Sequence, residues 1–164
     1  MRVNTKTRSR SASPGNRRTR PAARRVWTED DLHEAIASAL DEALPKGWIH
    51  QCVENGGSRG KAEAGKLKAR GVKPGFPDHM ILGPADAPCV FLELKRPGGG
   101  RTSEVQERMH ETLRAAGHIV GVVRSLDEAD AVLRYAGIDL RTDLASAHSR
   151  ARARKQTKRS KRTR

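Results

Sequence analysis

The sequence predicts one α/β domain in which helices flank a central mixed sheet, with elements in the order αβββαβα. Apolar residues recur at helical spacing in three segments, and short β-like runs lie between them. A chain of 164 residues is long enough for one domain with a core and too short for two enzymatic domains. We expect this domain to span residues 26–141, between disordered basic arms at residues 1–25 and 142–164.

The first half of the domain is expected to hold a helix, a strand and a long loop. Thr28 suits an N-cap with Asp31 as its capping-box acid, and apolar residues then recur at helical spacing, which predicts a helix over residues 29–44. A short strand is expected from Trp48 to Val53. The Lys/Ala/Gly-rich residues 59–70 predict a weak helix within a long loop.

The second half is expected to contain a hairpin, two helices and a further strand. A turn-rich connection joins the expected strands 77–82 and 89–95, and it is short enough for an antiparallel pair. A helix is predicted from Thr102 or Ser103 to Ala116. The strand 119–123 has no polar alternation and should be covered on both faces, and a last helix is expected over 126–136.

Charge is distributed unevenly along the chain, whose net charge is +14. Residues 26–140 hold 14 basic and 18 acidic side chains, so the positive excess lies in the two arms. Such arms suit a protein that binds a polyanion through salt-dependent phosphate contacts, although they would also serve solubility alone. The five aromatic residues are too few for the base-stacking platforms of single-strand or RNA binders.

The two cysteines and the lack of long apolar runs indicate the compartment. Cys52 and Cys89 lie far apart, without the Cys/His spacing of a zinc motif, and are expected to be buried thiols in a reducing environment. No run is long enough to span a membrane and no signal peptide is evident, so we expect a protein of the cytoplasm with no membrane partner.

A charged pair at the end of an apolar strand is the main candidate for a catalytic site. Side chains alternate along a strand, so Glu93 and Lys95 project to one face, while Leu92 and Leu94 project to the other. The expected hairpin places Asp78, at the start of one strand, beside Glu93, near the end of the next. Adjacent carboxylates suit a hard cation such as Mg²⁺ or Mn²⁺. Lys95 would then orient an attacking water, lower the pKa of that water, or stabilise charge on a reacting phosphate. The simpler interpretation is that Glu93 and Lys95 form a solvated ion pair and that Asp78 is a turn residue.

A longer pattern surrounds these residues and resembles the VRR-NUC family, the virus-type replication-repair nucleases of the PD-(D/E)xK superfamily, particularly its short stand-alone phage and prophage members. The resemblance covers residues 28–140. It lies in the segments 29–33, 43–45, 55–57, 64–69, 75–78, 93–98, 103–106, Gly117 and 120–125.

The resemblance implies an αβββαβ nuclease core with Asp78, Glu93 and the Leu94 carbonyl as metal ligands and Lys95 as the catalytic lysine. It also implies site roles for Glu29 and Gln106. Glu29 would equally favour the helix dipole, and Gln106 would form a capping box with Ser103. Further basic residues are candidates to contact the DNA backbone, or are ordinary solvated charges: Lys66, Lys68, Arg70, Lys73, Arg96 and Arg101.

We therefore expect a Mg²⁺-dependent (or Mn²⁺-dependent) deoxyribonuclease without a small-molecule cofactor. By resemblance it would prefer branched, flap or Holliday-junction DNA in phage or mobile-element replication and repair, within a bacterial or phage-infected cell. A homodimer would let a one-site domain cut both strands, but no segment marks a dimer interface. The alternatives are a non-catalytic DNA-binding or architectural protein with a decayed nuclease core, and a restriction-type endonuclease.

Overall fold

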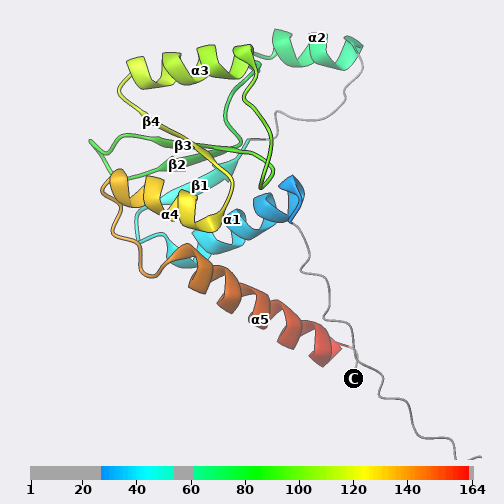
Figure 1. The fold of residues 1–164 in the computed structure, drawn as a ribbon, viewed down its shortest axis with the longest axis vertical. Helices are drawn as coiled ribbons and strands as arrows, with labels where there is room; N and C mark the ends of the chain where they lie inside the picture. Colours follow the sequence, from blue (N-terminus) through cyan, green and yellow to red (C-terminus); the bar gives the residue numbers. More distant parts are fainter. Residues whose placement is uncertain (1–26, 54–60, 163–164) are drawn as a thin grey trace, which may run out of the picture.

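The computed structural model describes residues 27–53 and 61–162, which form helices on both faces of a four-stranded sheet (Figure 1). The strands are β1 (Ile49–Cys52), β2 (His79–Leu82), β3 (Val90–Leu94) and β4 (Ile119–Val123). The helices are α1 (Glu29–Ala43), α2 (Lys61–Ala69), α3 (Glu104–Ala115), α4 (Leu126–Tyr135) and α5 (Leu144–Arg162). The predicted class, a mixed sheet flanked by helices, is confirmed. None of the described helices is long and apolar enough to cross a membrane.

The sheet order is β1-β2-β3-β4, and its pairing agrees with the predicted hairpin. β1 pairs with β2 and β2 with β3 in antiparallel fashion, whereas β3 and β4 run parallel. Residues 119–123 are covered on both faces, as predicted, by α3 on one and α4 on the other, but β4 is an edge strand and most of its residues are only half-buried. The strand that is buried throughout is the central β3.

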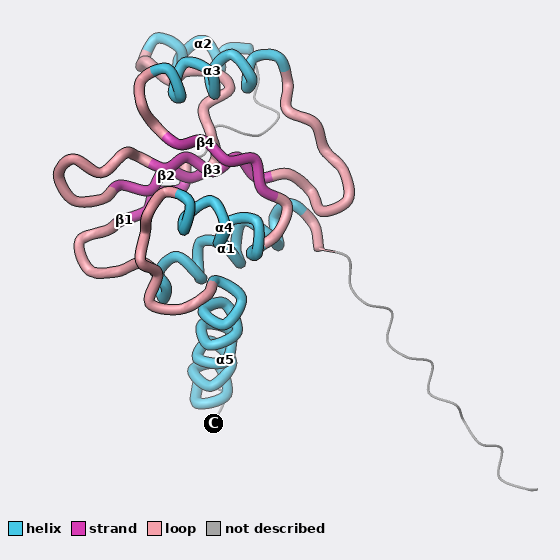
Figure 2. Tube along the Cα trace, turned by 60° about the vertical axis from the view of Figure 1, so that its left-hand side comes forward, coloured by secondary structure: helices cyan, strands magenta, loops and turns pink. Residues whose placement is uncertain are grey.

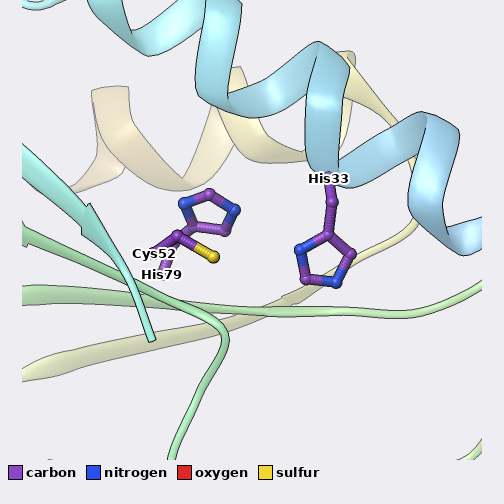
Figure 3. A group of neighbouring side chains, drawn as sticks. All are labelled: His33, Cys52 and His79. Atoms are coloured by element: carbon purple, nitrogen blue, oxygen red, sulfur yellow. The ribbon is translucent and has the colours of Figure 1, made fainter. Parts of the chain in front are cut away.

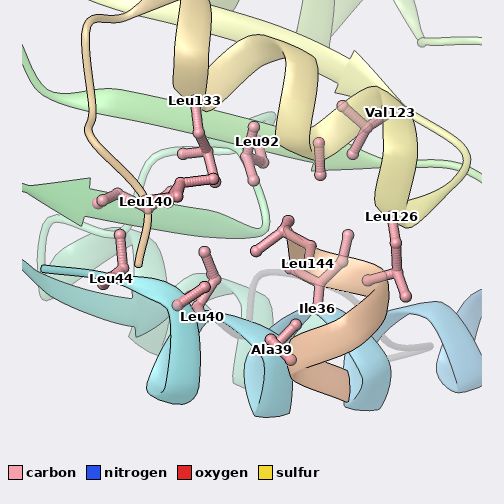
Figure 4. Packing of buried hydrophobic residues seen from close by; sticks show 14 of the residues in the cluster. Ile36, Ala39, Leu40, Leu44, Leu92, Val123, Leu126, Leu133, Leu140 and Leu144 are labelled. Carbon is pink, nitrogen blue, oxygen red and sulfur yellow. The ribbon is translucent and has the colours of Figure 1, made fainter. Parts of the chain in front are cut away.

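Helices cover the two faces of the sheet unequally. α3 lies on one side with α2 beyond it, while α1 and α4 cover the other side, with α5 packed beneath them (Figure 2). The apolar core fills the α1/α4 side, where Ile36 and Leu40 of α1 meet Leu92 of β3 and Leu133 of α4 (Figure 4). On the α3 side of β3 lie the charged Glu93 and the buried Phe91, whose ring packs against Phe76.

Local sequence fixes where the first helix begins. The hydroxyl of Thr28 accepts from the backbone N–H of Asp31, whose carboxylate accepts from the backbone N–H of Thr28, so the predicted capping box is present. Leu32, Ile36 and Leu40 then form one buried stripe of α1.

The prediction of a disordered arm after residue 142 is wrong. Residues 144–162 form α5, whose first turn buries Leu144 and Ala147 against the core. α5 also packs along α1, where His148 is hydrogen-bonded to Ser38 and Arg154 pairs with Glu42. The expected arm at residues 1–25 lies outside the described residues, as do the last two residues of the chain.

Candidate active site

The acids predicted from the sequence meet at one end of the β2–β3 hairpin. His79 pairs with Leu92, so Asp78 and Glu93 are the next residues on the two antiparallel strands and lie opposite one another. Asp78 Oδ2 accepts a 2.7 Å hydrogen bond from the backbone N–H of Leu94. This bond joins the residue that precedes β2 to the end of β3. It confirms the prediction that Asp78 lies beside the end of the strand that carries Glu93.

Glu93 is the most enclosed charged side chain of the site, with 1% of its surface exposed. Its Oε1 accepts from Lys95 Nζ at 2.5 Å and from the Gln106 side-chain amide at 2.6 Å. Its Oε2 is buried without a hydrogen-bond partner among the described residues. Both donors therefore converge on one of the two carboxylate oxygens.

Burial perturbs the titration of both acids. It raises the pKa of Glu93 to about 7, an effect that Lys95 partly opposes and that the neighbouring Asp78 reinforces. Burial also raises the pKa of Asp78, while the hydrogen bond from Leu94 acts in the opposite direction. Two such carboxylates keep their charges only when positive charge lies beside them, and Lys95 supplies one such charge.

Helix α3 brings Gln106 to Glu93. Ser103 caps the helix, and the Gln106 side-chain oxygen accepts from the Ser103 backbone N–H while its amide donates to Glu93. One side chain therefore completes the capping box and also contacts Glu93.

Glycine is required where the loop before β2 passes the start of α3. Gly75 has φ +77°, and a Cβ there would lie 2.6 Å from the carbonyl oxygen of Val105. The loop before β2 therefore packs closely against the start of α3, the helix that carries Gln106.

Glu29 also reaches the site, from the start of α1. Its Oε2 accepts from the backbone N–H of Arg96, the residue that follows Lys95. A depression of about 410 Å³ contains Glu29, Asp78, Glu93, Lys95 and Gln106 in its lining, so the structure brings together the five side chains that the sequence assigned to catalysis.

The predicted DNA-contacting residues lie outside this depression. Lys66 and Lys68 of α2, together with Arg70 and Lys73 of the following loop, are exposed. Arg96 and Arg101 are exposed on the segment that follows β3, close in sequence to the site. Their exposure leaves them accessible to a partner.

One buried residue beside Glu93 was missed in the sequence. His110 of α3 is 2% exposed, and its Nε2 lies 3.6 Å from Glu93 Oε2. It follows Gln106 by four residues and so shares the same helix face, which was the signal available in the sequence.

The two cysteines differ from expectation, since both are half-buried rather than buried. Cys52 lies near His33 and His79, a grouping that the spacing in the sequence does not reveal. His33 also approaches the acids, with its Nε2 4.0 Å from Asp78 Oδ2. Burial lowers the pKa of His79 to about 4.

Comparison with known proteins identifies the fold. No protein-family model matches the chain, and no curated protein matches it. Among solved structures it is similar to one described as a "VRR_NUC domain protein", with 22% sequence identity and a TM-score of 0.53 over 68% of this chain and 88% of that one. The mixed α/β architecture that carries Asp78 and Glu93 is therefore the fold of a VRR_NUC domain protein.

Proposed function

We propose that the protein is a divalent-metal-dependent nuclease that hydrolyses DNA phosphodiester bonds in the depression around Asp78, Glu93 and Lys95. The observation that carries this proposal is the buried Glu93, held at the end of an apolar strand by Lys95 and Gln106 and placed opposite Asp78. Burying a charge is costly unless function or pairing compensates for it. The VRR_NUC fold supports the same conclusion.

The donor set fits a hard divalent cation, Mg²⁺ or Mn²⁺. The pKa values of both acids are raised by burial, so a cation would favour the state in which both are charged. Glu93 Oε2 is an unpartnered buried oxygen among the described residues. Asp78, Glu93 and the Leu94 carbonyl would hold the ion, which supplies Lewis-acid polarisation of a phosphate oxygen and acidifies bound water.

The other side chains have distinct proposed roles. Lys95 has three N–H donors and uses one on Glu93, so the others are available to an attacking water or a phosphate oxygen. Gln106 holds the Glu93 carboxylate in place. Glu29 fixes the backbone that follows Lys95 through its bond to Arg96.

DNA is the proposed substrate because basic side chains are exposed near the depression and along α5. Lys66, Lys68, Arg70, Lys73, Arg96 and Arg101 are exposed and would contact DNA phosphates. The finer assignment, to branched or flapped DNA in phage or mobile-element replication and repair, is supported by the sequence resemblance. We also propose that two copies act together on the two strands of such a substrate, since each domain has one such set of acids.

The test is cleavage of linear duplex, flap and four-way-junction DNA by the purified chain in Mg²⁺, Mn²⁺ or EDTA. Asp78→Asn and Glu93→Gln should abolish cleavage while leaving DNA binding in EDTA nearly unchanged. Asp86→Asn is a matched control, because Asp86 lies in the turn at the other end of the hairpin and its φ of 72° is tolerated by asparagine.

The outcomes separate the proposal from its rivals. A chain that binds DNA but cleaves none of the substrates in either metal would be a non-catalytic DNA-binding protein. Cleavage confined to one short duplex sequence would indicate a restriction-type enzyme. Equal cleavage by the wild type and both acid variants would remove the site assignment.

A further inference from the structure

Three side chains with nitrogen and sulfur donors converge on the α1 side of the sheet. His33 comes from α1, Cys52 from β1 and His79 from β2, and one donor atom of each lies within 4.8 Å of the others. Figure 3 shows the His33 ring descending from the helix towards the Cys52 sulfur and the His79 ring on the strands. The group is separate from the carboxylates but adjoins them, because His79 follows Asp78.

Tertiary structure alone creates this group. Cys52 and His79 are direct partners in the antiparallel register of β1 and β2, so their side chains lie on one face of the sheet. Ile81, two residues after His79, faces the core beneath α1, and His33 follows the buried Leu32 on that helix. Residues 19 and 27 positions apart therefore become neighbours.

His79 is the residue that most needs a ligand. It is fully buried, and neither of its ring nitrogens has a hydrogen-bond partner among the described residues. A buried polar group without a partner is costly, and such a group in a native fold calls for an explanation. His50 is nearby, with ring centroids 6.2 Å apart, but its Nε2 is within 2.9 Å of Asp41 Oδ1.

We propose that His33, Cys52 and His79 form a second metal site, for a borderline-soft divalent transition ion, of which Zn²⁺ is the best match. Imidazole and thiolate are the ligands that Zn²⁺ prefers, whereas the hard Mg²⁺ prefers the carboxylates of the neighbouring site. Three protein ligands leave the fourth tetrahedral position for water. His33 and Cys52 are half-buried, which gives the ion a route from solvent.

Binding would join three elements that surround the acids. The ion links α1 to the β1–β2 pair and holds His79, the residue next to Asp78. It also holds the ring of His33, whose Nε2 otherwise lies 4.0 Å from Asp78 Oδ2. The expected consequences are a more stable domain and a fixed start of β2.

The experiment uses the full chain, stripped with EDTA and returned to buffer containing excess Mg²⁺ to occupy the carboxylates. Co²⁺ added to the wild type should give the near-ultraviolet charge-transfer band of a cobalt–thiolate bond, and Zn²⁺ should displace it. Zn²⁺ should also raise the melting temperature of the wild type. Neither readout depends on cleavage of DNA.

Cys52→Ser and His33→Gln should each weaken Zn²⁺ binding by about 100-fold or more, since even outer-shell changes cost 10-fold to 100-fold in affinity. Cys52→Ser should also remove the thiolate band. Cys89→Ser is the matched cysteine control and Glu93→Gln the control for the carboxylate site, and both should bind Zn²⁺ as the wild type does. Should Cys52→Ser fail to fold, His33→Gln carries the same test.

Two results would overturn the proposal. One is a wild-type Co²⁺ spectrum without a thiolate band. The other is Zn²⁺ binding that survives Cys52→Ser and His33→Gln but disappears in Glu93→Gln, which would place the ion on the carboxylates. That second result would leave the proposed nuclease function standing, so the two proposals fail separately.

Discussion

Glu93 Oε2 lies 3.6 Å from His110 Nε2, and neither atom has a hydrogen-bond partner among the described residues. Both side chains are almost completely buried between β3 and α3. Burial is the main cause of both pKa shifts, raising that of Glu93 and lowering that of His110. Burial therefore favours the neutral forms of both side chains, and the ion pair with Lys95 opposes this effect at Glu93.

The first prediction concerns the stability of the metal-free protein as a function of pH. The pKa of Glu93 is raised from 4.5 to about 7, so the folded state retains a proton that the unfolded state has already released between these values. The free energy of unfolding should therefore fall as pH rises through this window, by about 1.4 kcal/mol for each unit of pKa difference. Glu93→Gln removes this contribution.

The measurement is urea unfolding in EDTA at a series of pH values. The stability of Glu93→Gln relative to the wild type should increase from roughly pH 5 to pH 8 and then level off, because the folded-state pKa has been passed. Parallel profiles for the two proteins would contradict the assigned pKa shift.

The second prediction concerns Lys95, whose Nζ lies 2.5 Å from Glu93 Oε1. Lys95→Ala should lower the rate of DNA cleavage at saturating substrate by about 10²–10³, the usual effect of losing one positioned electrostatic group. Single-turnover kinetics measure this rate. The comparison is Lys73→Ala, an exposed lysine of the loop before β2, which should weaken DNA binding and leave the saturated rate unchanged. Normal turnover by Lys95→Ala would make Lys95 merely an ion-pair partner of Glu93.

The third prediction concerns Gly75, which lies in the loop before β2 and faces the start of α3. Gly75→Ala combines a φ of +77° with a Cβ placed 2.6 Å from the Val105 carbonyl oxygen. Gly71→Ala is the matched control, with φ +88° but nothing within 4 Å of its Cβ. The left-handed conformation costs roughly 1–2 kcal/mol in either variant, and overpacking should add a further 1–3 kcal/mol in Gly75→Ala alone.

Denaturant unfolding of the two glycine variants measures this difference. Gly75→Ala should also reduce cleavage, because a shift of α3 moves Gln106 away from Glu93. Equal destabilisation by the two variants would show that the approach to Val105 does not constrain the loop.

The active-site strands were predictable because their signals are local. Alternation along a strand places Glu93 and Lys95 on one face, and a short turn fixes the antiparallel partner that brings Asp78 beside them. Likewise, capping residues at Thr28 and Ser103 mark the starts of two helices within a few residues.

What escaped prediction depends on long-range packing. The group of His33, Cys52 and His79 requires the β1–β2 register and the position of α1, neither of which is encoded in residue spacing. The position of α5 depends on long-range contacts with α1 and α4, among them those of the buried Leu144 and Ala147. Composition describes the charge of this segment correctly but not its conformation.

The last prediction follows from that ordered helix. Beyond the buried Leu144 and Ala147, α5 carries no acid. Among the residues of α5 whose burial the structure describes, seven basic side chains are exposed: Arg150, Arg152, Arg154, Lys155, Lys158, Arg159 and Lys161. A chain ending at Ser149 should bind duplex DNA more weakly. The dependence of log K on log salt should also flatten, by about 0.9 of slope for each DNA phosphate that the shortened chain no longer neutralises.

This truncation should leave the fold intact, because it retains Leu144, Ala147 and the hydrogen bond between His148 and Ser38. The truncation removes the ion pair of Arg154 with Glu42, but such an exposed pair contributes little. Deletion from residue 142, in contrast, removes two core side chains and should lower the melting temperature.

The control for the helix itself replaces Arg152, Lys155, Lys158 and Lys161 with glutamine in the full chain, which removes charge while keeping good helix formers. If α5 contributes affinity through its charge, this variant should show most of the change in salt slope seen on truncation. A truncated protein whose affinity and salt slope match the full chain would assign the phosphate-binding role to Lys66, Lys68, Arg70 and Lys73 of α2 and the loop before β2 instead.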